Sequence, residues 1–180
     1  MNLKDLTWEN HKKAERKEFA SILMSGNIDP GLYYKYLTNQ FHMYATLEQG
    51  LNELGLSSDH WGVFRAELML EDLQELEAEH GLSFYEGILC DVTGQYTSYI
   101  EELVSAGNLE PLIAHMYVRH FGDMYGGAMI QKRVPGKGVA YEFNNKEELK
   151  ANLRGLLNDG MAVEANVCFE YAIKLFEELT

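Results

Sequence analysis

The sequence predicts an all-α fold, arranged as a single compact multi-helix domain over residues 1–180. Only three prolines occur among the 180 residues, and glycine or proline interrupts the chain at long intervals. Such wide spacing of turn signals favours helices over the shorter strands of a β fold. A chain of this length commonly forms one domain and buries a substantial core without disulfides or a structural metal.

The N-terminal third is predicted to form two helices separated by a short turn. The first runs over residues 7–25 and ends before Gly26. Asp29 and Pro30 then match a helix N-cap followed by proline at the first helical position. The second helix therefore begins at Pro30 and continues to about residue 54.

Two more helices are predicted in the middle of the chain. One covers residues 59–80 and ends before Gly81. The next begins at Ser83, because Ser83 precedes Glu86 with the spacing of a capping box. It runs to residue 106.

The C-terminal half is predicted to begin with a glycine-rich helix over residues 111–134. Residues 135–143 follow as a loop with a short extended piece. Helical patterning resumes at Asn144 and runs to residue 179, with a break near Gly160. No internal repeat or low-complexity linker interrupts this order.

Composition narrows the classes of function that are compatible with the chain. Its net charge of −13 argues against a general affinity for nucleic acid or an anionic membrane. The N-terminal stretch lacks the apolar segment of a secretory signal, and no run of about 20 apolar residues could span a bilayer. Cys90 and Cys168 lack paired spacing, so no disulfide framework or zinc signature is visible. We therefore expect a soluble, cytoplasmic protein with no membrane or nucleic-acid partner.

The few basic residues are clustered on this acidic chain. One cluster lies early in the sequence and the other follows the glycine-rich segment: Lys12, Lys13, Arg16 and Lys17; Lys132, Arg133 and Lys137. Such clusters are either solvated helix faces or docking points for an anionic group.

Three glycines lie close together within a segment that otherwise has helical spacing. Gly122, Gly126 and Gly127 fall inside "HFGDMYGGAMIQKR", residues 120–133. Each glycine in a helix interior costs about 1 kcal/mol relative to alanine. Either another helix packs closely against this bare strip, or a planar ligand lies on it.

The neighbours of these glycines favour a ligand. Asp123 lies between them, and Arg119 lies four residues earlier on the same helical side. An acidic and a basic group beside a bare strip indicate a polar, water-holding pocket. Tyr117 and Tyr125 add hydroxyl groups nearby.

His11 is a candidate metal ligand. Glu15 lies four residues later, so both side chains project from one helix face. A carboxylate in this position fixes the tautomer of the imidazole and leaves the second ring nitrogen free for a metal. The same pair also occurs by chance on surface helices. Zinc would require more ligands, whereas one axial histidine is sufficient for haem.

These segments resemble the haem oxygenase family, and the resemblance covers nearly the whole chain. "LKDLTWENHKKAERKEF" is similar to the proximal helix of that family, and "YVRHFGDMYGGAMIQK" is similar to its distal helix. The distal pattern of the family is Tyr-x-Arg-x-x-Gly-Asp-x-x-Gly-Gly. Its six fixed positions match Tyr117, Arg119, Gly122, Asp123, Gly126 and Gly127. The C-terminal "LFEEL" is also similar to the end of the family's catalytic domain.

The resemblance implies roles for the residues on both sides of a bound haem. His11 would be the axial iron ligand, held in place by Glu15. Asp123 would anchor the water network that delivers protons to the reacting oxygen, supported by Arg119 and Tyr44.

The resemblance also implies how the macrocycle is held. The three distal glycines, Gly122, Gly126 and Gly127, would let their helix pass close over the haem. Four residues would recognise the haem propionates: Lys4, Tyr117, Lys150 and Arg154. Phe169 and Phe176 would line the pocket. The seven-residue spacing of the two phenylalanines also suits a plain core stripe. Tyr125 and Ala172 depart from the family pattern and leave the regiochemistry of ring opening undetermined.

The implied activity is the oxidative cleavage of haem to biliverdin, with release of iron and carbon monoxide. Haem would be both substrate and cofactor, and O2 the oxidant. No flavin or nicotinamide fingerprint is present, so electrons would come from a ferredoxin or a reductase. The cluster Lys12, Lys13, Arg16 and Lys17 is a hypothetical docking site for that donor. A bilin reductase is a further expected partner, and the chain resembles the soluble bacterial, algal or phage members.

Alternatives from other classes stay open at this point. A thiaminase-like enzyme on the same architecture would need a catalytic cysteine among carboxylates, a setting that neither Cys90 nor Cys168 shows. A di-iron oxidase would need two Glu-x-x-His motifs, and Glu77 with His80 supplies one. A haem carrier or sensor would need only His11.

Overall fold

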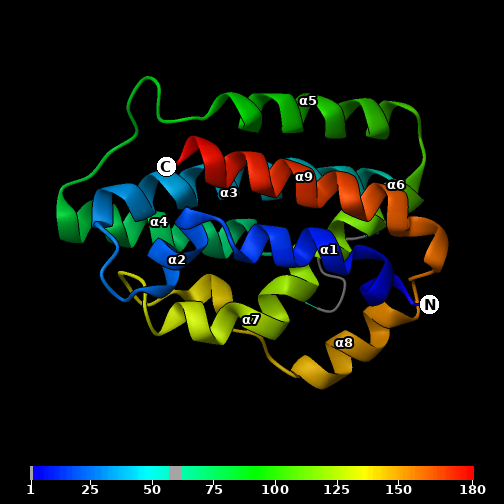
Figure 1. The fold of residues 1–180 in the computed structure, drawn as a ribbon. Helices are drawn as coiled ribbons and strands as arrows, with labels where there is room; N and C mark the ends of the chain where they lie inside the picture. Colours follow the sequence, from blue (N-terminus) through cyan, green and yellow to red (C-terminus); the bar gives the residue numbers. More distant parts are fainter. Residues whose placement is uncertain (1, 57–61) are drawn as a thin grey trace.

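Nine α-helices make up most of the part of the chain that the structure describes, residues 2–56 and 62–180 of a computed structural model (Figure 1). Their bounds are α1 Leu3–Glu15, α2 Glu18–Met24, α3 Pro30–Glu53, α4 Ala66–His80, α5 Asp91–Ser105, α6 Leu109–Met116, α7 Gly122–Gln131, α8 Lys146–Arg154 and α9 Ala162–Glu178. A π-helical turn, η1 Tyr117–Phe121, joins α6 to α7, and η2 Val139–Tyr141 and η3 Asp159–Met161 are 3-10 turns. The predicted all-α class is confirmed.

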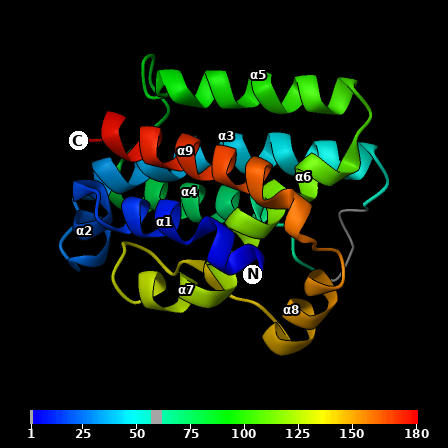
Figure 2. The ribbon, with the colours of Figure 1, turned by 45° about the vertical axis from the view of Figure 1, so that its right-hand side comes forward.

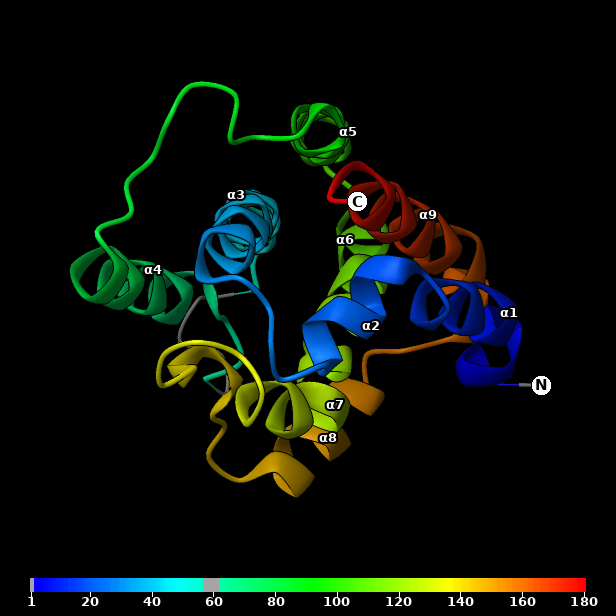
Figure 3. The same cartoon turned by 60° about the vertical axis from the view of Figure 1, so that its left-hand side comes forward.

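The long helices lie side by side around the core. Helix α3 packs against α4 and α5, and α9 packs against α1 and α6. Figure 3, which looks nearly along several helix axes, shows α3 and α4 on one side, α1 and α9 on the other, and α7 with α8 below. None of the described helices is both long and apolar enough to cross a bilayer.

Helix α3 contributes most to the core. Its cap forms as the sequence predicts, because the Asp29 carboxylate accepts a hydrogen bond from the Leu32 amide at 3.1 Å and Pro30 occupies the first turn. Buried side chains then occur along nearly its whole length, among them Tyr33, Leu37, Met43, Tyr44, Leu47 and Leu51. A helix that is apolar on most of its faces belongs in the interior.

The predicted helix over residues 7–25 is wrong in its bounds. Helix α1 begins earlier, where the Asn2 side chain caps the Asp5 amide at 3.0 Å, and it ends at Glu15. Lys17 is extended, so α2 is a separate helix. The bend allows Phe19 to reach the core, where its ring lies 5.0 Å from that of Tyr36.

The predicted start of the helix over residues 59–80 lies among residues 57–61, which are outside the described part of the chain. Residues 62–65 are not helical, and α4 begins at Ala66. The start is fixed by a carboxylate from another helix, since Glu48 accepts hydrogen bonds from the amides of Arg65 and Ala66 at 2.6 and 2.9 Å. The predicted end is confirmed, because Gly81 adopts the left-handed conformation that closes a helix.

The capping box at Ser83 was the wrong start for the following helix, which begins at Asp91. Residues 81–90 form an irregular segment instead. Asn39 of α3 holds this segment by donating to the Ile88 carbonyl at 3.0 Å and accepting from the Cys90 amide at 2.8 Å. These long-range hydrogen bonds outweigh the local helix signal.

The glycine-rich segment is helical, as predicted, but its centre is a π-helical turn. The chain leaves α6 at Met116, widens through Tyr117–Phe121 and re-enters α-helical geometry at Gly122. Single π turns inside longer helices are rare and often mark functional sites. This turn places one extra residue per turn directly before the glycines.

The segment over residues 135–143 contains the 3-10 turn η2 rather than the predicted extended piece. Asp72 of α4 holds this turn by accepting hydrogen bonds from the Val139 and Ala140 amides at 2.9 and 3.0 Å. The predicted break near Gly160 is confirmed, because η3 separates α8 from α9 there.

Gly127 is the point where α7 comes closest to η2. A Cβ atom at Gly127 would lie 2.9 Å from Cδ1 of Tyr141, which is shorter than ordinary contact. Tyr141 is itself buried and has little room to move. For this glycine, close packing is therefore the reason that no side chain is present.

We expect Gly127→Ala to lower the free energy of unfolding by about 1–2 kcal/mol, because overpacking against Tyr141 exceeds the gain in helix propensity. Gly94→Ala in α5 is the matched control, since a Cβ there meets nothing within 4 Å. The control should be neutral or stabilising by up to about 1 kcal/mol. Urea denaturation of both variants measures this, and equal changes in the two would contradict the packing argument.

Candidate functional site

A cavity of about 900 Å³ lies between α1, the glycine-rich segment and the residues that follow α8. Figure 2 shows α1 above α7, with α8 near the N-terminus. Helix α1 contributes one face, the series of side chains from Leu3 through His11 to Glu15. The opposite wall comes from η1 and α7, and Phe169 of α9 completes the lining.

His11 is fixed on the α1 wall but remains accessible. Its Nε2 lies 2.8 Å from Oε1 of Glu15, as the i, i+4 spacing predicts. The ring stacks on Trp8 at 5.4 Å and meets the edge of Phe169 at 5.9 Å. The His11 side chain is 43% exposed, so this packing leaves it open toward the cavity. Since Glu15 accepts the proton of one ring nitrogen, the other nitrogen carries a free lone pair. Rotation of the ring about its bond to Cβ interchanges the positions of Nδ1 and Nε2.

Gly122 and Gly126 form the bare part of the opposite wall. A Cβ atom at either position meets nothing within 4 Å, and both residues line the cavity. Gly127, one residue further, faces Tyr141 instead and is not part of the lining. Each explanation for the glycine strip therefore holds for some of its residues. Gly122 and Gly126 leave space for a ligand, and Gly127 allows close packing.

Asp123 lies behind this wall, hydrogen-bonded to the interior. The Tyr44 hydroxyl donates to Asp123 Oδ2 at 2.7 Å and also lies 3.2 Å from the Arg119 carbonyl. Burial raises the pKa of Asp123 to about 6, while the Tyr44 hydrogen bond and the nearby charges of His120, Arg65 and Arg119 act in the opposite direction. Asp123 can therefore change its protonation state close to neutral pH.

Arg119 does not point toward Asp123, although their spacing predicted a shared helical side. The Arg119 guanidinium donates to the Tyr96 hydroxyl at 3.1 Å and to Oε1 of Gln40 at 3.3 Å. It also lies over the Tyr96 ring at 4.4 Å. The π turn changes the angular relation between the two residues, so the Arg119 guanidinium points into the interior and its carbonyl lies near the Tyr44 hydroxyl.

Of the three cationic residues expected to bind the haem propionates, two line the cavity and one does not. Lys4 and Arg154 line the cavity, as does Tyr117. Lys150 does not; its Nζ lies 4.0 Å from the centre of the Tyr125 ring and 3.4 Å from Glu147. Arg154 donates a hydrogen bond to the Tyr125 hydroxyl. Tyr125 therefore links both cations at the mouth of the cavity.

Of the two phenylalanines expected to line the pocket, one does so and the other packs in the core. Phe169 lines the cavity beside His11. Phe176 packs instead against Phe19, with ring centres 5.5 Å apart, and against Tyr36 at 6.4 Å. Phe176 therefore occupies the core stripe that its spacing also allowed.

Several residues of the site were missed by sequence reasoning. Trp8 stacks on His11, and its position three residues before the histidine was the available signal. Leu157, Asn158 and Asp159 reach the cavity from the segment after α8, which carries no local pattern.

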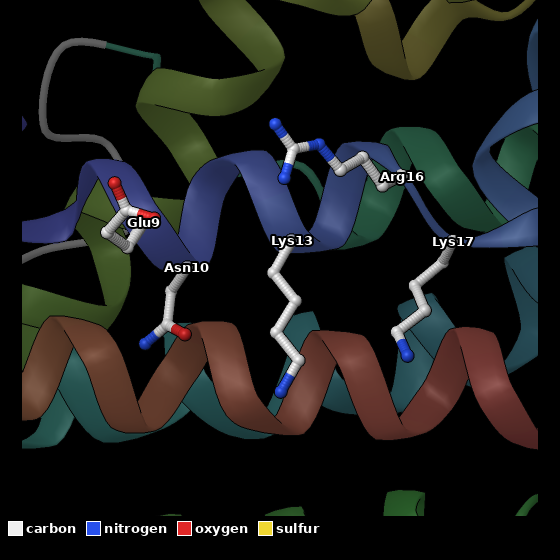
Figure 4. Close-up of a pocket in the computed structure, with 5 residues that line it drawn as sticks. All are labelled: Glu9, Asn10, Lys13, Arg16 and Lys17. Atoms are coloured by element: carbon white, nitrogen blue, oxygen red, sulfur yellow. The ribbon is translucent and has the colours of Figure 1, made fainter.

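A smaller groove of about 380 Å³ lies along the outer side of α1. Figure 4 shows Lys13 and Lys17 pointing toward α9, while Arg16 points away from it. Lys17 pairs with Glu177 at 3.3 Å, and Lys12 pairs with Glu9 at 3.1 Å. The predicted basic cluster is therefore partly neutralised, with Lys13 and Arg16 as its exposed members.

Across residues 2–56 and 62–180, no three His, Cys, Asp or Glu side chains are arranged to hold a metal ion. Glu77 accepts a hydrogen bond from the Tyr34 hydroxyl at 2.6 Å. Cys90 and Cys168 are free and buried. The surroundings of Cys168 are not apolar as expected, because Arg119, His115 and Tyr96 lie beside its thiol and lower its pKa, against the effect of burial.

In this all-helical domain, His11 faces the bare strip of Gly122 and Gly126 across one cavity. Helical proteins of this class can enclose a flat ligand between two helices. The family model for heme oxygenase matches residues 1–178, so the chain belongs to the haem oxygenase family. It is 28% identical to heme oxygenase 2 of Rattus norvegicus over 98% of this chain and 64% of that protein, so it spans less than two thirds of that relative. It is also 26% identical to heme oxygenase of Porphyra purpurea, covering 98% of this chain and 84% of that one.

Solved structures show the same fold. Heme oxygenase from Leptospira interrogans matches with a TM-score of 0.83 and 28% identity, over 99% of this chain and 100% of that one. Heme oxygenase-1 from Synechocystis sp. PCC6803, solved in complex with heme, matches with a TM-score of 0.84 and 21% identity, over 98% and 90% of the two chains.

We expect Asp123→Asn to stabilise the haem-free protein at neutral pH. The folded-state pKa of about 6 lies above the ordinary value of 3.8, so folding favours the protonated carboxyl and opposes the charged one. The variant should therefore gain about 1–3 kcal/mol at pH 7.5, and the gain should disappear as the pH falls toward about 4. Denaturation midpoints at both pH values test this, with Glu79→Gln on the surface as the control. A gain independent of pH would contradict this origin.

Proposed function

We propose that the protein is an enzyme that cleaves haem oxidatively to biliverdin, releasing iron and carbon monoxide, with O2 as oxidant and electrons from an external donor. The observation that carries this proposal is the placement of His11 and Glu15 across one cavity from Gly122 and Gly126. Membership of the haem oxygenase family supports it. The related Synechocystis structure holds heme, which supports the same ligand here.

The residues present fit a haem. The cavity volume of about 900 Å³ lies within the range of small-molecule sites, and its walls carry apolar and aromatic side chains such as Leu3, Phe121 and Phe169. His11 offers one nitrogen ligand for the iron, with its orientation set by Glu15. Bound haem supplies the iron that activates O2 and the macrocycle that is opened.

The chain's own residues then orient the substrate and handle protons. Gly122 and Gly126 let the α7 backbone approach the macrocycle. Asp123 holds or releases a proton near neutral pH, and the Tyr44 hydroxyl keeps its carboxylate in position. A group with a pKa close to the operating pH is the most effective acid–base catalyst. Arg119 acts as support for Tyr44 through its carbonyl.

Lys4 and Arg154 are proposed to bind the haem carboxylates, assisted by the Tyr117 hydroxyl. Lys150 is proposed to join them by leaving the ring of Tyr125, a residue that itself lines the cavity. Gly127 and Phe176 act indirectly in this proposal, because they pack against Tyr141 and Phe19 rather than line the cavity.

The partners follow from the redox requirement of the reaction. A ferredoxin or a reductase would supply the electrons, and a bilin reductase would consume the product. We propose a cytoplasmic location, where such reduced carriers are found. A haem carrier or sensor would require only the His11 wall, whereas the partly buried Asp123–Tyr44 pair opposite it suits a protein that transfers protons.

Haemin titration tests the proposed activity. We expect a sharp Soret band at one equivalent, which decays to the broad red absorption of biliverdin after reductant and O2 are added. His11→Ala should shift the Soret band and weaken haemin affinity at least tenfold, since it removes the iron ligand. His80→Ala, outside the cavity, is the control. A stable Soret band with a competent donor would support a carrier or sensor, and no Soret band would exclude the haem proposal.

Charge reversal tests the docking of the donor. We expect Lys13→Glu with Arg16→Glu to raise the donor's KM about tenfold at low salt, because opposite charges steer electron-transfer partners. The difference should shrink as ionic strength rises. Lys132→Glu with Arg133→Glu, in the second basic cluster, is the matched control. Unchanged turnover and salt dependence in the first variant would remove this docking site.

A further inference from the structure

Tyr125 lines the cavity, but the proposed function gives its hydroxyl group no role. It lies on α7 between Gly122 and Gly126, where the sequence departs from the family pattern. The residue is 58% exposed, and its ring stacks on that of Phe121 one turn earlier, with ring centres 5.9 Å apart and planes inclined by 17°. Stacking limits the rotation of the ring, so the hydroxyl group has a defined position at the mouth of the cavity.

Helix α8 brings two cations to this one side chain. Figure 3 shows α8 beside α7, below the other helices. The Arg154 guanidinium donates a hydrogen bond to the Tyr125 hydroxyl, and the Lys150 ammonium lies 4.0 Å from the centre of the Tyr125 ring. The second distance is within the range of a cation–π contact. Tyr125 therefore gathers both cations of α8 at the place where the proposed function needs them.

The hydrogen-bonding capacity of Tyr125 and Arg154 is only partly used. A tyrosine hydroxyl donates one proton and also accepts, and a guanidinium donates five N–H protons. Across residues 2–56 and 62–180, the Tyr125 proton has no acceptor, and the Arg154 guanidinium uses one donor and pairs with no carboxylate. Lys150, by contrast, pairs with Glu147 at 3.4 Å. Tyr125 and Arg154 therefore offer unpaired donors and one unbalanced positive charge to a ligand.

Attachment of α8 to the bundle does not by itself explain Tyr125. Leu149 and Leu153, which are 4% and 1% exposed, already pack α8 into the core. A tyrosine that is more than half exposed adds little apolar burial to this packing. A phenylalanine would stack on Phe121 equally well, so packing gives no reason for the hydroxyl group. A polar role at the mouth of the cavity does give a reason.

A carboxylate is the ligand group that matches these donors. Its two oxygens accept several hydrogen bonds, and those from a guanidinium or a hydroxyl group to a charged oxygen are short and strong. Tyr125 can accept from Arg154 and donate to the carboxylate at the same time, so the contact between the two residues is kept when the ligand binds. The adjoining cavity is lined by apolar side chains such as Leu3 and Phe169, which suit a flat apolar body with acid groups at its edge.

We propose that Tyr125 binds a carboxylate of haem by donating its hydroxyl proton to the same group that Arg154 pairs with. The inference rests on the proposed function and deepens it, since it adds a recognition residue that the family pattern does not supply. Tyr125 belongs to α7, which carries the bare glycines, and Arg154 belongs to α8. A carboxylate bound by both residues ties the substrate to both helices at once.

Tyr125→Phe isolates the hydroxyl group. The variant keeps the ring, its stacking on Phe121 and the face that Lys150 contacts. The matched control is Tyr85→Phe, because Tyr85 is similarly exposed, at 51%, and lies outside the cavity lining. Both substitutions remove one exposed oxygen atom, so neither should change the midpoint of urea denaturation of the haem-free protein.

The test is a titration of the wild-type protein and both variants with two iron porphyrins, followed by the Soret band. Haemin carries two carboxylates, whereas iron etioporphyrin carries only alkyl side chains. We expect Tyr125→Phe to weaken haemin binding about tenfold, because a hydrogen bond to a charged group is lost. Binding of iron etioporphyrin should change less than about twofold, since it has no group that accepts the proton. Tyr85→Phe should leave both affinities unchanged.

Three results with Tyr125→Phe would overturn the inference. An equal loss for both porphyrins would show that the hydroxyl group acts through packing, and tighter haemin binding would show that Tyr125 competes with the carboxylate for Arg154. Unchanged haemin binding would remove the hydroxyl group from recognition.

Failure of the proposed function is a separate result of the same titration. A wild-type protein that binds haemin without cleaving it would contradict the proposed activity, while the tenfold difference between the two porphyrins would still support the carboxylate site. A wild-type protein that cleaves haem, with a Tyr125→Phe variant that binds haemin equally tightly, would overturn this inference alone. Absence of any Soret band with haemin would overturn both.

Discussion

The hydrogen bond from Tyr44 to Asp123 joins the longest helix to the glycine-rich one, and the geometry of the cavity depends on it. It ties α7 to α3 at Asp123, which is not part of the cavity lining, while Gly122 and Gly126 of α7 face the cavity. Gly127 and Tyr141 complete this attachment by close contact. Because α7 is fixed from behind, Gly122 and Gly126 can stay free of side-chain contacts without loss of a defined wall.

Helix α3 organises the molecule through buried polar side chains rather than through apolar packing alone. Asn39 holds the segment before α5, Glu48 holds the start of α4, and Tyr44 holds α7. The segments before α4 and before α5 carry no local signal for the conformation that they adopt. Buried polar groups whose hydrogen bonds are satisfied specify one arrangement, since any shift would leave them unpaired. The helix that ties down the glycine-rich wall of the cavity is thus the same one that fixes the start of α4 and the segment before α5.

The same contacts explain which features the sequence could predict. Helix ends marked by Asp29 with Pro30 and by Gly81 are local signals and were found, as was the pairing of His11 with Glu15. The helix expected from Ser83 was wrong because a side chain distant in sequence holds that segment, and no local pattern reports this. Within the site, spacing placed Arg119 beside Asp123, but the π turn separates their directions. Family resemblance brought Tyr44 to the site, although it also grouped Gly127 and Phe176 with residues that line the cavity.

The π turn over Tyr117–Phe121 has a consequence for how this chain can change during evolution. A π turn accommodates one residue more than an α-helical turn, so it acts as a local insertion that the helix has absorbed. Deleting one residue there would remove the bulge and restore regular α-helical winding, while the helix that follows keeps its direction. By contrast, deleting one residue from a regular α-helical turn rotates everything after it by about 100°. The π turn is therefore the place where this segment can lose one residue without turning the glycine strip away from His11, although Tyr117 and Arg119 within it make contacts of their own.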